Sequence, residues 1–372
     1  MKLLCFHPAL APYRIDFFNL LAKKCEMKMM LLQKNLKTQK FEQRTLLAKC
    51  EFVPEYMLKG FDCKGRMIRF GALWRILKEK PDIVVGYEAS PLMMELCLLK
   101  PFFKWKLWTS MDDSPSLIEK RSGLRRFVRD WVIRRCDGVI VPSDEAIGVY
   151  HSALRVGAST KLISVPIIYD EKKFRRDEKI VFDKAAKWRS ENLKDDERAV
   201  FFVGRLSPEK NLKWLVERVA DRRWPKNTRL FLVGGGPRQE SLATMVQELG
   251  LDETVRFCGR EEGLRLQTYF ASADLFILPS LSEPFGAVVS ESLHWGCPCL
   301  VSDQVGAKSL IAPSNGAVFE VGNETDFYEQ LRNIMAQDKW DRSKDGGRPS
   351  LMKVNLQTCI DNLVEEMCAD GK

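Results

Sequence analysis

FFVGRLSPEKNLKWLVE (residues 201–217) passes from an apolar strand pattern through a polar loop into an amphipathic helix pattern. A strand that is apolar throughout is typical of a parallel sheet covered on both faces. The same order of strand, loop and helix recurs on both sides of this stretch. The sequence therefore predicts an α/β fold built from parallel sheets.

Two series of such units follow one another along the chain. Strand patterns occur at 2–6, 27–33, 82–87, 106–110, 138–143 and 162–167, and then at 199–204, 229–235, 255–259, 275–280 and 299–302. Helical patterns occur at 13–24, 124–136, 212–220, 238–250, 266–273 and 287–296. We expect two doubly wound, Rossmann-like domains, and a single mixed domain with a long helical insert is the alternative. Open parallel sheets bind ligands beyond the carboxyl ends of their strands, so the site is expected in a central cleft between the two sheets.

The domain boundaries follow from charge and pattern. We predict an N-terminal domain at 1–175, a densely charged linker without a strand pattern at 176–198, and a C-terminal domain at 199–345. The remaining segment, 346–372, contains a helical pattern that can pack back on the N-terminal domain.

The composition is that of a globular protein. The 372 residues are 45% hydrophobic and 29% charged, and no apolar run reaches the roughly 18 residues needed to span a bilayer. The first residues do not resemble a signal peptide, because His7, Pro8, Pro12 and Arg14 interrupt the apolar run. Eleven cysteines without paired spacing and three histidines without metal-ligand spacing predict reduced thiols, no metal site and a cytoplasmic location.

Charge is unevenly distributed along the chain. Residues 1–190 carry 37 Lys and Arg against 22 Asp and Glu, whereas residues 191–372 carry 22 against 28. The first half is therefore expected to meet an anionic partner, either a membrane surface or a diphosphate-bearing acceptor, unless its basic surface is simply solvated. The stretches 98–108 and 121–136 mix cations with aromatic residues, which favours a membrane surface. No nucleic-acid partner is expected, because that reading would rest on charge alone.

The loop after the strand at 199–204 brings two cations to a position where such a sheet binds its ligand. Gly204 ends the strand, and Arg205 and Lys210 can hold phosphate oxygens, unless they are solvated surface cations. The next strand ends in LVGGGPRQESL (232–242). Backbone amides around Gly235 can approach a diphosphate or a sugar there, although a tight turn explains the glycines equally well.

A third loop, SEPFGAVVSESLHWGCPCLVS (282–302), contains two carboxylates in an apolar run. A helix is expected to start near Gly286, and its first amides can bind a phosphate. Glu283 can reach a sugar hydroxyl or cap the helix, and Glu291 can hold a diol or form an ion pair. The step VRFCGR (255–260) can bring backbone to a nucleotide base.

Taken together, these four segments resemble a known family. VGRLSPEKN, VGGGP, VRFCGR and EPFGAVVSE occur in the order and spacing of retaining glycosyltransferases of the GT-B architecture, specifically glycosyltransferase family 4. The last segment is similar to the family's E-x7-E motif, and the resemblance covers about residues 199–310. It implies a GT-B fold with a donor-binding C-terminal domain.

The resemblance also implies a role for each residue. Arg205 and Lys210 would hold the donor diphosphate, Glu283 the donor sugar and Glu291 the ribose. The amides of Phe285, Gly286 and Ala287 would meet the sugar or the diphosphate, Arg260 would lie beside the base, and Gly204 and Gly235 would allow close approach. Neither cofactor nor metal is implied, because fixed cations and helix amides can stabilise the leaving diphosphate.

The first half departs from the family pattern. PYRIDFFNLLAKK (12–24) resembles the family's first loop and helix, so that Tyr13 and Arg14 would lie on the acceptor side. Many family members carry a histidine after a mid-domain strand, but the comparable stretch LWTSMDDSPS (107–116) has none. Asp112 or Asp113 is expected to take its place and to orient the sugar or the acceptor.

The implied activity is transfer of a hexose-type sugar, with retention, from a UDP- or GDP-sugar to a glycan or lipid-linked glycan, as in cell-surface polysaccharide synthesis. A non-catalytic glycan- or nucleotide-binding protein on the same scaffold, or a GT-B epimerase, is the alternative. The enzyme would lie in the cytoplasm or peripherally on the cytoplasmic face of the membrane.

Overall fold

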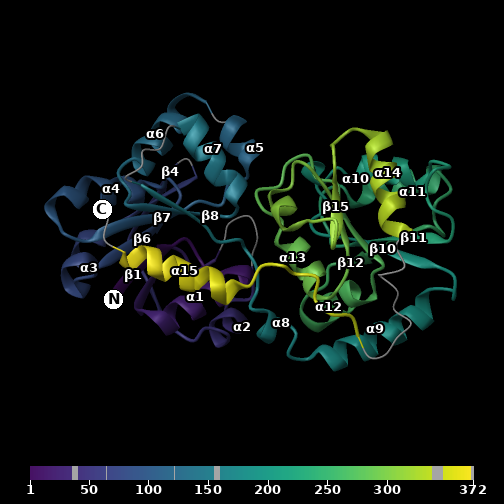
Figure 1. Cartoon of the computed structure of the whole chain (residues 1–372), viewed down its shortest axis with the longest axis horizontal. Helices are drawn as coiled ribbons and strands as arrows, with labels where there is room; N and C mark the ends of the chain where they lie inside the picture. The colour runs from purple at the N-terminus through teal and green to yellow at the C-terminus, as the bar shows by residue number, and fades with distance from the viewer. Residues whose placement is uncertain (36–40, 64, 121, 155–159, 337–346, 370–372) are drawn as a thin grey trace. The chain divides into compact units, whose positions relative to one another are not determined.

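The structure is a computed structural model, and it describes residues 1–35, 41–63, 65–120, 122–154, 160–336 and 347–369. The chain forms two compact units (Figure 1). The first unit comprises Met1–Asp170 and Asn355–Lys372, and the second is the continuous segment Glu171–Val354.

A parallel sheet of seven strands organises the first unit. Its strands are β1 (Lys2–His7), β2 (Glu26–Leu31), β3 (Pro54–Tyr56), β6 (Ile83–Tyr87), β7 (Lys106–Ser110), β8 (Gly138–Val141) and β9 (Lys161–Ser164). They lie in the order β3-β2-β1-β6-β7-β8-β9, so the order reverses between β1 and β6. A separate antiparallel hairpin pairs β4 (Gly60–Cys63) with β5 (Arg66–Arg69). The reversal is the feature of a doubly wound sheet that creates a crevice for ligands.

Helices cover this sheet. They are α1 (Pro12–Lys24), α2 (Gln43–Ala48), α3 (Ala72–Glu79), α4 (Pro91–Leu99), η1 (Lys100–Phe102), α5 (Pro115–Lys120), α6 (Gly123–Ile133), α7 (Asp144–Leu154) and α15 (Leu356–Cys368). One core cluster joins side chains of α3, α4, α5, α6 and α7 to strands of the sheet. The C-terminal helix α15 lies beside α1 (Figure 1).

The second unit repeats the plan with six parallel strands. They are β10 (Arg198–Val203), β11 (Thr228–Val233), β12 (Val255–Gly259), β13 (Leu275–Leu278), β14 (Cys299–Ser302) and β15 (Gly316–Phe319). Their order is β12-β11-β10-β13-β14-β15, which is the strand order of the Rossmann fold. Its helices are α8 (Glu171–Phe174), α9 (Glu178–Asn192), η2 (Pro208–Lys210), α10 (Leu212–Val219), α11 (Gln239–Glu248), α12 (Gly263–Ser272), α13 (Ala287–His294), η3 (Gly306–Leu310) and α14 (Glu324–Met335).

The predicted α/β fold with two doubly wound sheets is confirmed, and the alternative of a single mixed domain is wrong. The chain passes from the first unit to the second at residues 170/171, close to the predicted end of the first domain at 175. The stretch predicted as a linker, 176–198, contains α9 and belongs to the second unit. Val181 and Ala185 of α9 are buried, and the Trp188 ring lies 5.0 Å from that of Phe231.

The last helix returns to the first unit. Leu356, Ile360, Leu363 and Met367 of α15 are buried. The Lys106 ammonium, at the start of β7, donates to the carbonyl oxygens of Met367 at 3.2 Å and Ala369 at 3.1 Å. A lysine at this end of a helix satisfies carbonyl groups that have no partner within the helix.

Candidate donor and acceptor sites

Lys210 and Glu283 form an ion pair at the point where the strand order of the second sheet reverses. Lys210 ends η2 in the loop after β10, and Glu283 lies in the loop after β13. Their side chains are only 14% and 15% exposed. The two loops are also joined by a hydrogen bond from the Leu281 amide to the Glu209 carbonyl at 2.8 Å. Two predicted site residues that are far apart in the sequence therefore meet where a doubly wound sheet binds its ligand.

Glu283 is held by its backbone as well as by Lys210. Its amide donates to the Gln304 carbonyl at 3.2 Å, and its own carbonyl accepts from the Gly306 amide at 3.1 Å. It is not the helix cap, because α13 begins after Gly286, whose φ of +92° is left-handed. A side chain at Gly286 would be strained in that conformation, which explains the glycine. The sequence allowed Glu283 either to contact a sugar hydroxyl or to cap the helix, and the structure excludes capping.

Arg205 differs from Lys210 in its exposure. Its side chain is 59% exposed, and its guanidinium pairs with Glu209 at 2.9 Å. The Ser207 hydroxyl donates to the same carboxylate at 2.6 Å and is the main reason that the pKa of Glu209 lies below its usual value. Surface pairs of this kind contribute little to stability, so Arg205 can exchange Glu209 for an anionic ligand at small cost.

The three glycines after β11 have different roles. A Cβ atom on Gly234 would clash with the Gly204 carbonyl oxygen, and one on Gly236 would lie 2.5 Å from the Leu206 carbonyl oxygen. The loops after β10 and β11 thus pack backbone to backbone, and these two glycines permit it. Gly235 is not constrained in this way, since its Cβ would meet only the Gln239 side chain at 3.6 Å. Tight packing therefore explains Gly234 and Gly236, whereas Gly235 has free space beside its Cα.

The predicted residues of α13 lie in and around its first turns. Phe285 is buried, and its carbonyl accepts from the Ala307 amide at 2.7 Å. Ala287 is the first residue of the helix, and Glu291 lies half-buried one turn further on. The first turn carries no acidic side chain, so its amides keep the partial positive charge that favours an anion.

Arg260 is the predicted residue that lies apart from the others. It follows β12, which forms one edge of the sheet, and its side chain is 66% exposed. Its guanidinium is paired with Glu262 at 2.5 Å. Its predicted place beside a base stays a prediction.

In the first unit, Arg14 and Asp112 form an ion pair near the carboxyl ends of the strands. Arg14 on α1 is buried, and Asp112 follows β7. The Tyr87 hydroxyl donates to the same carboxylate at 3.1 Å. Tyr13, also predicted on the acceptor side, lies half-buried next to Arg14. The structure therefore joins Arg14, predicted on the acceptor side, to Asp112, predicted to take the place of the family's histidine.

Asp113 points to a different arginine. It is buried and forms an ion pair with Arg129 of α6, which also donates to the Tyr150 hydroxyl and, at 3.4 Å, to Glu88. Arg129 itself is 2% exposed. The adjacent carboxylates Asp112 and Asp113 thus pair with two different guanidinium groups.

Three residues of this network, Glu88, Arg129 and Tyr150, were not predicted from the sequence. Glu88 follows β6 with a left-handed φ of +56°, and its carboxylate accepts from the Asp112 amide at 3.3 Å. Burial, with the negative charge of Asp113 as the next cause, raises the pKa of Glu88 to about 7. Its place directly after a predicted strand was the available signal, since ligands bind at such positions.

A histidine is present in this network, although not where the family pattern has one. His7 ends β1, is buried, and its Nδ1 lies 2.9 Å from the Ala9 carbonyl oxygen. Its ring packs edge-on against Tyr87 at 4.9 Å. Burial first, and then the charge of Arg14, lower the pKa of His7 to about 4, so its imidazole is neutral at pH 7.

Two further findings concern metals and membranes. Among the described residues, no group of three or more His, Cys, Asp or Glu is arranged to hold a metal ion. No helix within the described ranges is both long and apolar enough to cross a bilayer.

Residues 183–345 match the family described as Glycosyl transferases group 1, and all four quoted motifs lie within this range. An uncharacterized glycosyltransferase of Methanocaldococcus jannaschii is 33% identical over 123 residues, 33% of this chain and 32% of that protein. The D-inositol 3-phosphate glycosyltransferase of Nocardia farcinica is 34% identical over 151 residues, 38% of this chain and 34% of that protein. The chain thus matches about a third of the length of these curated relatives.

Solved structures are similar in fold to this chain over nearly its whole length. Anabaena HepE in complex with UDP has a TM-score of 0.72 at 17% identity, covering 98% of this chain and 99% of that one. Sucrose-phosphate synthase from Thermosynechococcus elongatus has a TM-score of 0.66 at 19% identity, covering 97% and 94%. The chain therefore has the GT-B fold, with two Rossmann-like units.

Proposed function

We propose that the protein is a glycosyltransferase that moves a hexose-type sugar from a UDP- or GDP-sugar to a glycan or lipid-linked glycan. The match of residues 183–345 to Glycosyl transferases group 1 supports this. Similar proteins include the lipopolysaccharide core biosynthesis glycosyltransferase LpsE of Rhizobium meliloti, 29% identical over 144 residues, 38% of this chain and 41% of that one. We further propose retention of the anomeric configuration and assignment to glycosyltransferase family 4, both from the E-x7-E pattern of Glu283 and Glu291.

The observation that carries the proposal is the Lys210–Glu283 ion pair at the strand-order reversal. Negative charge develops on the diphosphate as the sugar leaves. Lys210, Arg205 and the first amides of α13 are the groups of the second unit that can stabilise that charge. Glu283, fixed by Lys210, would accept a hydroxyl of the donor sugar.

The remaining donor contacts follow the open positions of the site. Gly235 has room for the diphosphate or the sugar, and Phe285 and Gly286 contribute backbone at the start of α13. Glu291 would accept the two hydroxyls of the ribose, and Arg260 would lie beside the base. Because these groups supply the charge, we propose that the reaction needs neither metal nor cofactor.

In the first unit we propose Tyr13 and Arg14 on the acceptor side, and Asp112 and Asp113 as catalytic residues in place of the family's histidine. Asp112 and Asp113 would orient the acceptor or the sugar, and their ion pairs with Arg14 and Arg129 would fix the loop after β7. We place the enzyme in the cytoplasm, peripherally on the membrane if its acceptor is lipid-linked.

Incubation of the pure protein with a panel of nucleotide sugars tests the proposal. Binding is followed by calorimetry, slow donor hydrolysis by product analysis, and the anomeric configuration of the released sugar by NMR. We expect one UDP- or GDP-sugar to bind and to be hydrolysed slowly with retention. Binding of a nucleotide without turnover, even with glycan acceptors, would favour a non-catalytic binding protein, and C2 inversion of the free donor would indicate an epimerase.

A further inference from the structure

The segment between β3 and β6 exposes an unusual amount of apolar surface. The β4–β5 hairpin and α3 form most of it. Six large side chains of this segment are exposed: Leu58, Phe61, Phe70, Leu73, Trp74 and Leu77. We call them, with the cations among them, the hairpin–α3 surface. Trp74 is 57% exposed, and burial of side chains of this size in an apolar medium is favourable, so such a surface indicates a partner.

Local structure keeps these side chains together. The Phe61 and Phe70 rings lie 6.0 Å apart, and the Phe70 amide donates to the Lys59 carbonyl at 2.9 Å. Gly71, with a left-handed φ of +109°, then leads directly into α3. Residues three and four apart share one side of a helix, so Trp74 and Leu77 continue the apolar surface along α3.

The same segment is strongly basic. Residues 57–80 contain seven Lys and Arg against two Asp and Glu. Both acids are already paired, Asp62 with Arg69 at 2.9 Å and Glu79 with Arg75 at 3.8 Å. Lys59, Arg66 and Lys80 are exposed and form no ion pair with any described residue. The surface therefore presents unbalanced positive charge among its apolar side chains.

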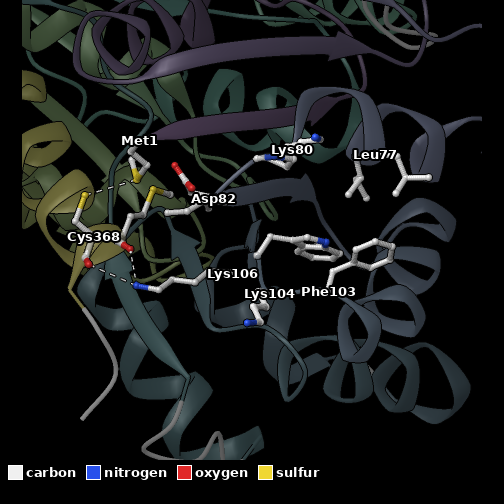
Figure 2. Close-up of a pocket in the computed structure, with 13 residues that line it drawn as sticks. Met1, Leu77, Lys80, Asp82, Phe103, Lys104, Lys106 and Cys368 are labelled. Carbon is white, nitrogen blue, oxygen red and sulfur yellow. Dashed lines mark hydrogen bonds between the residues drawn. The ribbon is translucent and has the colours of Figure 1, made fainter.

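The surface continues into a hollow at the end of α3. An open pocket of about 580 Å³ is lined by apolar side chains that include Leu77, Phe103 and Trp105, with Lys80 and Lys104 also in its lining (Figure 2). Met1 and Asp82 lie in the same pocket, directly before β1 and β6. The pocket thus lies at the amino ends of the strands, opposite the edge that carries Asp112 and Glu88.

We propose that the hairpin–α3 surface docks the protein on a lipid bilayer containing anionic lipids. Aromatic and aliphatic side chains enter the region between headgroups and acyl chains, while nearby cations bind lipid phosphates. The inference rests on the peripheral location in the proposed function and names the surface that would provide it, and docking itself requires neither donor nor acceptor.

Charge and side-chain type favour a bilayer over other partners. A second copy of this chain would set one positive surface against another, which is repulsive. Single-stranded nucleic acid would use the aromatic rings and cations but would leave Leu58, Leu73 and Leu77 without apolar contacts. A bilayer with anionic lipids satisfies both kinds of side chain at once.

Helix α6 lies in the stretch 121–136, for which the sequence also favoured a membrane surface, and it provides a matched control. It exposes Leu124 and Phe127, by 73% and 66%, in the same unit. The cations of α6 are more engaged, since Arg129 is 2% exposed and paired with Asp113 and Arg126 lies close to Asp130. Removing two exposed apolar side chains from α6 therefore tests whether loss of apolar surface alone weakens docking.

The test measures co-sedimentation of the full chain with phosphatidylcholine vesicles, with and without phosphatidylglycerol, at low and physiological salt. We expect binding only with phosphatidylglycerol. Trp74→Ser/Leu77→Ser and Lys80→Glu/Lys104→Glu should each weaken it about tenfold or more, and Leu124→Ser/Phe127→Ser should leave it within about twofold. Thermal unfolding of every variant reports whether the fold is kept.

Three results would overturn the inference. These are absence of vesicle binding by the wild type, equal loss in the α6 variant, or self-association of the wild type that Trp74→Ser/Leu77→Ser abolishes without loss of vesicle binding. Binding of single-stranded RNA in place of vesicles would assign the surface to nucleic acid. Nucleotide-sugar binding by the same variants is measured separately in solution, so failure of docking and failure of the proposed function are distinguishable.

Discussion

Lys210 carries the strongest single-residue prediction, because under the proposed function its ammonium would stabilise charge on the leaving diphosphate. Lys210→Ala should lower turnover of the donor about 10²–10³-fold, as loss of a group that stabilises transition-state charge does.

Glu291→Ala should weaken donor binding about tenfold by removing acceptors for the ribose hydroxyls. Steady-state kinetics with the donor identified from the panel measure both.

Lys213 is the matched control for Lys210. It lies three residues further on, is 79% exposed and pairs only loosely with Glu217 at 4.0 Å. Lys213→Ala removes the same charge and should leave kinetics unchanged. Wild-type turnover in Lys210→Ala, with unfolding unchanged, would remove Lys210 from the site.

Gly235 and Gly236 separate ligand approach from packing. Gly235→Ala adds a Cβ with no backbone within contact distance, so it should keep the wild-type Tm but weaken donor binding about tenfold. Gly236→Ala pushes the Leu206 carbonyl and should lower the free energy of unfolding by about 1–3 kcal/mol. Thermal unfolding and nucleotide calorimetry distinguish the two, and equal donor affinity in Gly235→Ala and the wild type would contradict its role.

Glu88 should make stability depend on pH. Its carboxyl has a pKa of about 7 in the folded chain against an ordinary value of 4.5, so the folded state holds the proton more tightly. The free energy of unfolding should therefore fall by about 1–3 kcal/mol as pH rises from about 4.5 to 7. Charged and titratable groups around it are Asp112, Asp113, Arg129 and Tyr150.

Glu88→Gln isolates this contribution. The amide keeps the size of the side chain and does not titrate, so the variant should lose most of the decline over the same pH window. Urea unfolding at several pH values measures the difference between the two proteins. An identical pH profile in wild type and variant would show that Glu88 titrates normally.

At the scale of elements, a strand could be predicted from the sequence where both faces of the sheet are buried. The strands β1, β10 and β13 each contain a continuous apolar run, and the structure places each within one or two residues of its predicted range. The β4–β5 hairpin was missed because all of β4 is exposed, so it has no apolar pattern. Helix α9 was predicted as a linker because charged residues separate its few apolar ones. The structure shows that these apolar residues form one face, which packs on the sheet beside Phe231.

The site shows the same limit. Lys210 and Glu283 could be predicted as neighbours from the loops after their strands, since the edge at which such loops meet is a property of the topology, and the structure pairs them. Arg129 was missed because an arginine in an amphipathic helix normally faces solvent. Only the tertiary structure reveals that it is 2% exposed and bound to Asp113.

Helix α15 should stabilise the first unit through its buried face. Ile360 is fully buried, so Ile360→Ala should lower the free energy of unfolding by about 2–5 kcal/mol. Asp361, whose carboxylate forms a surface ion pair with Lys24 at 2.8 Å, is the control, and Asp361→Ala should cost at most about 1 kcal/mol. Urea unfolding compares them, and equal effects would mean that α15 is not packed as described.

At the scale of the whole molecule, the two units differ in how the chain builds them. The second unit is one continuous segment, 171–354, and contains the whole range that matches Glycosyl transferases group 1. The first unit is discontinuous, because α15 returns to it from the end of the chain. A continuous segment that contains a complete sheet and its helices can fold by itself. Residues 1–170 alone would expose the apolar side chains on which α15 packs.

We therefore expect the fragment 171–354 to unfold cooperatively and to bind the nucleotide of the donor, because Lys210, Glu283 and Gly235 all belong to it. The fragment 1–170 should be less stable than a version in which a short linker joins it to residues 355–372, since the four buried side chains of α15 are missing. Circular dichroism melts and nucleotide calorimetry measure both. A folded 171–354 fragment that fails to bind a nucleotide bound by the full chain would show that the second unit does not hold the donor alone.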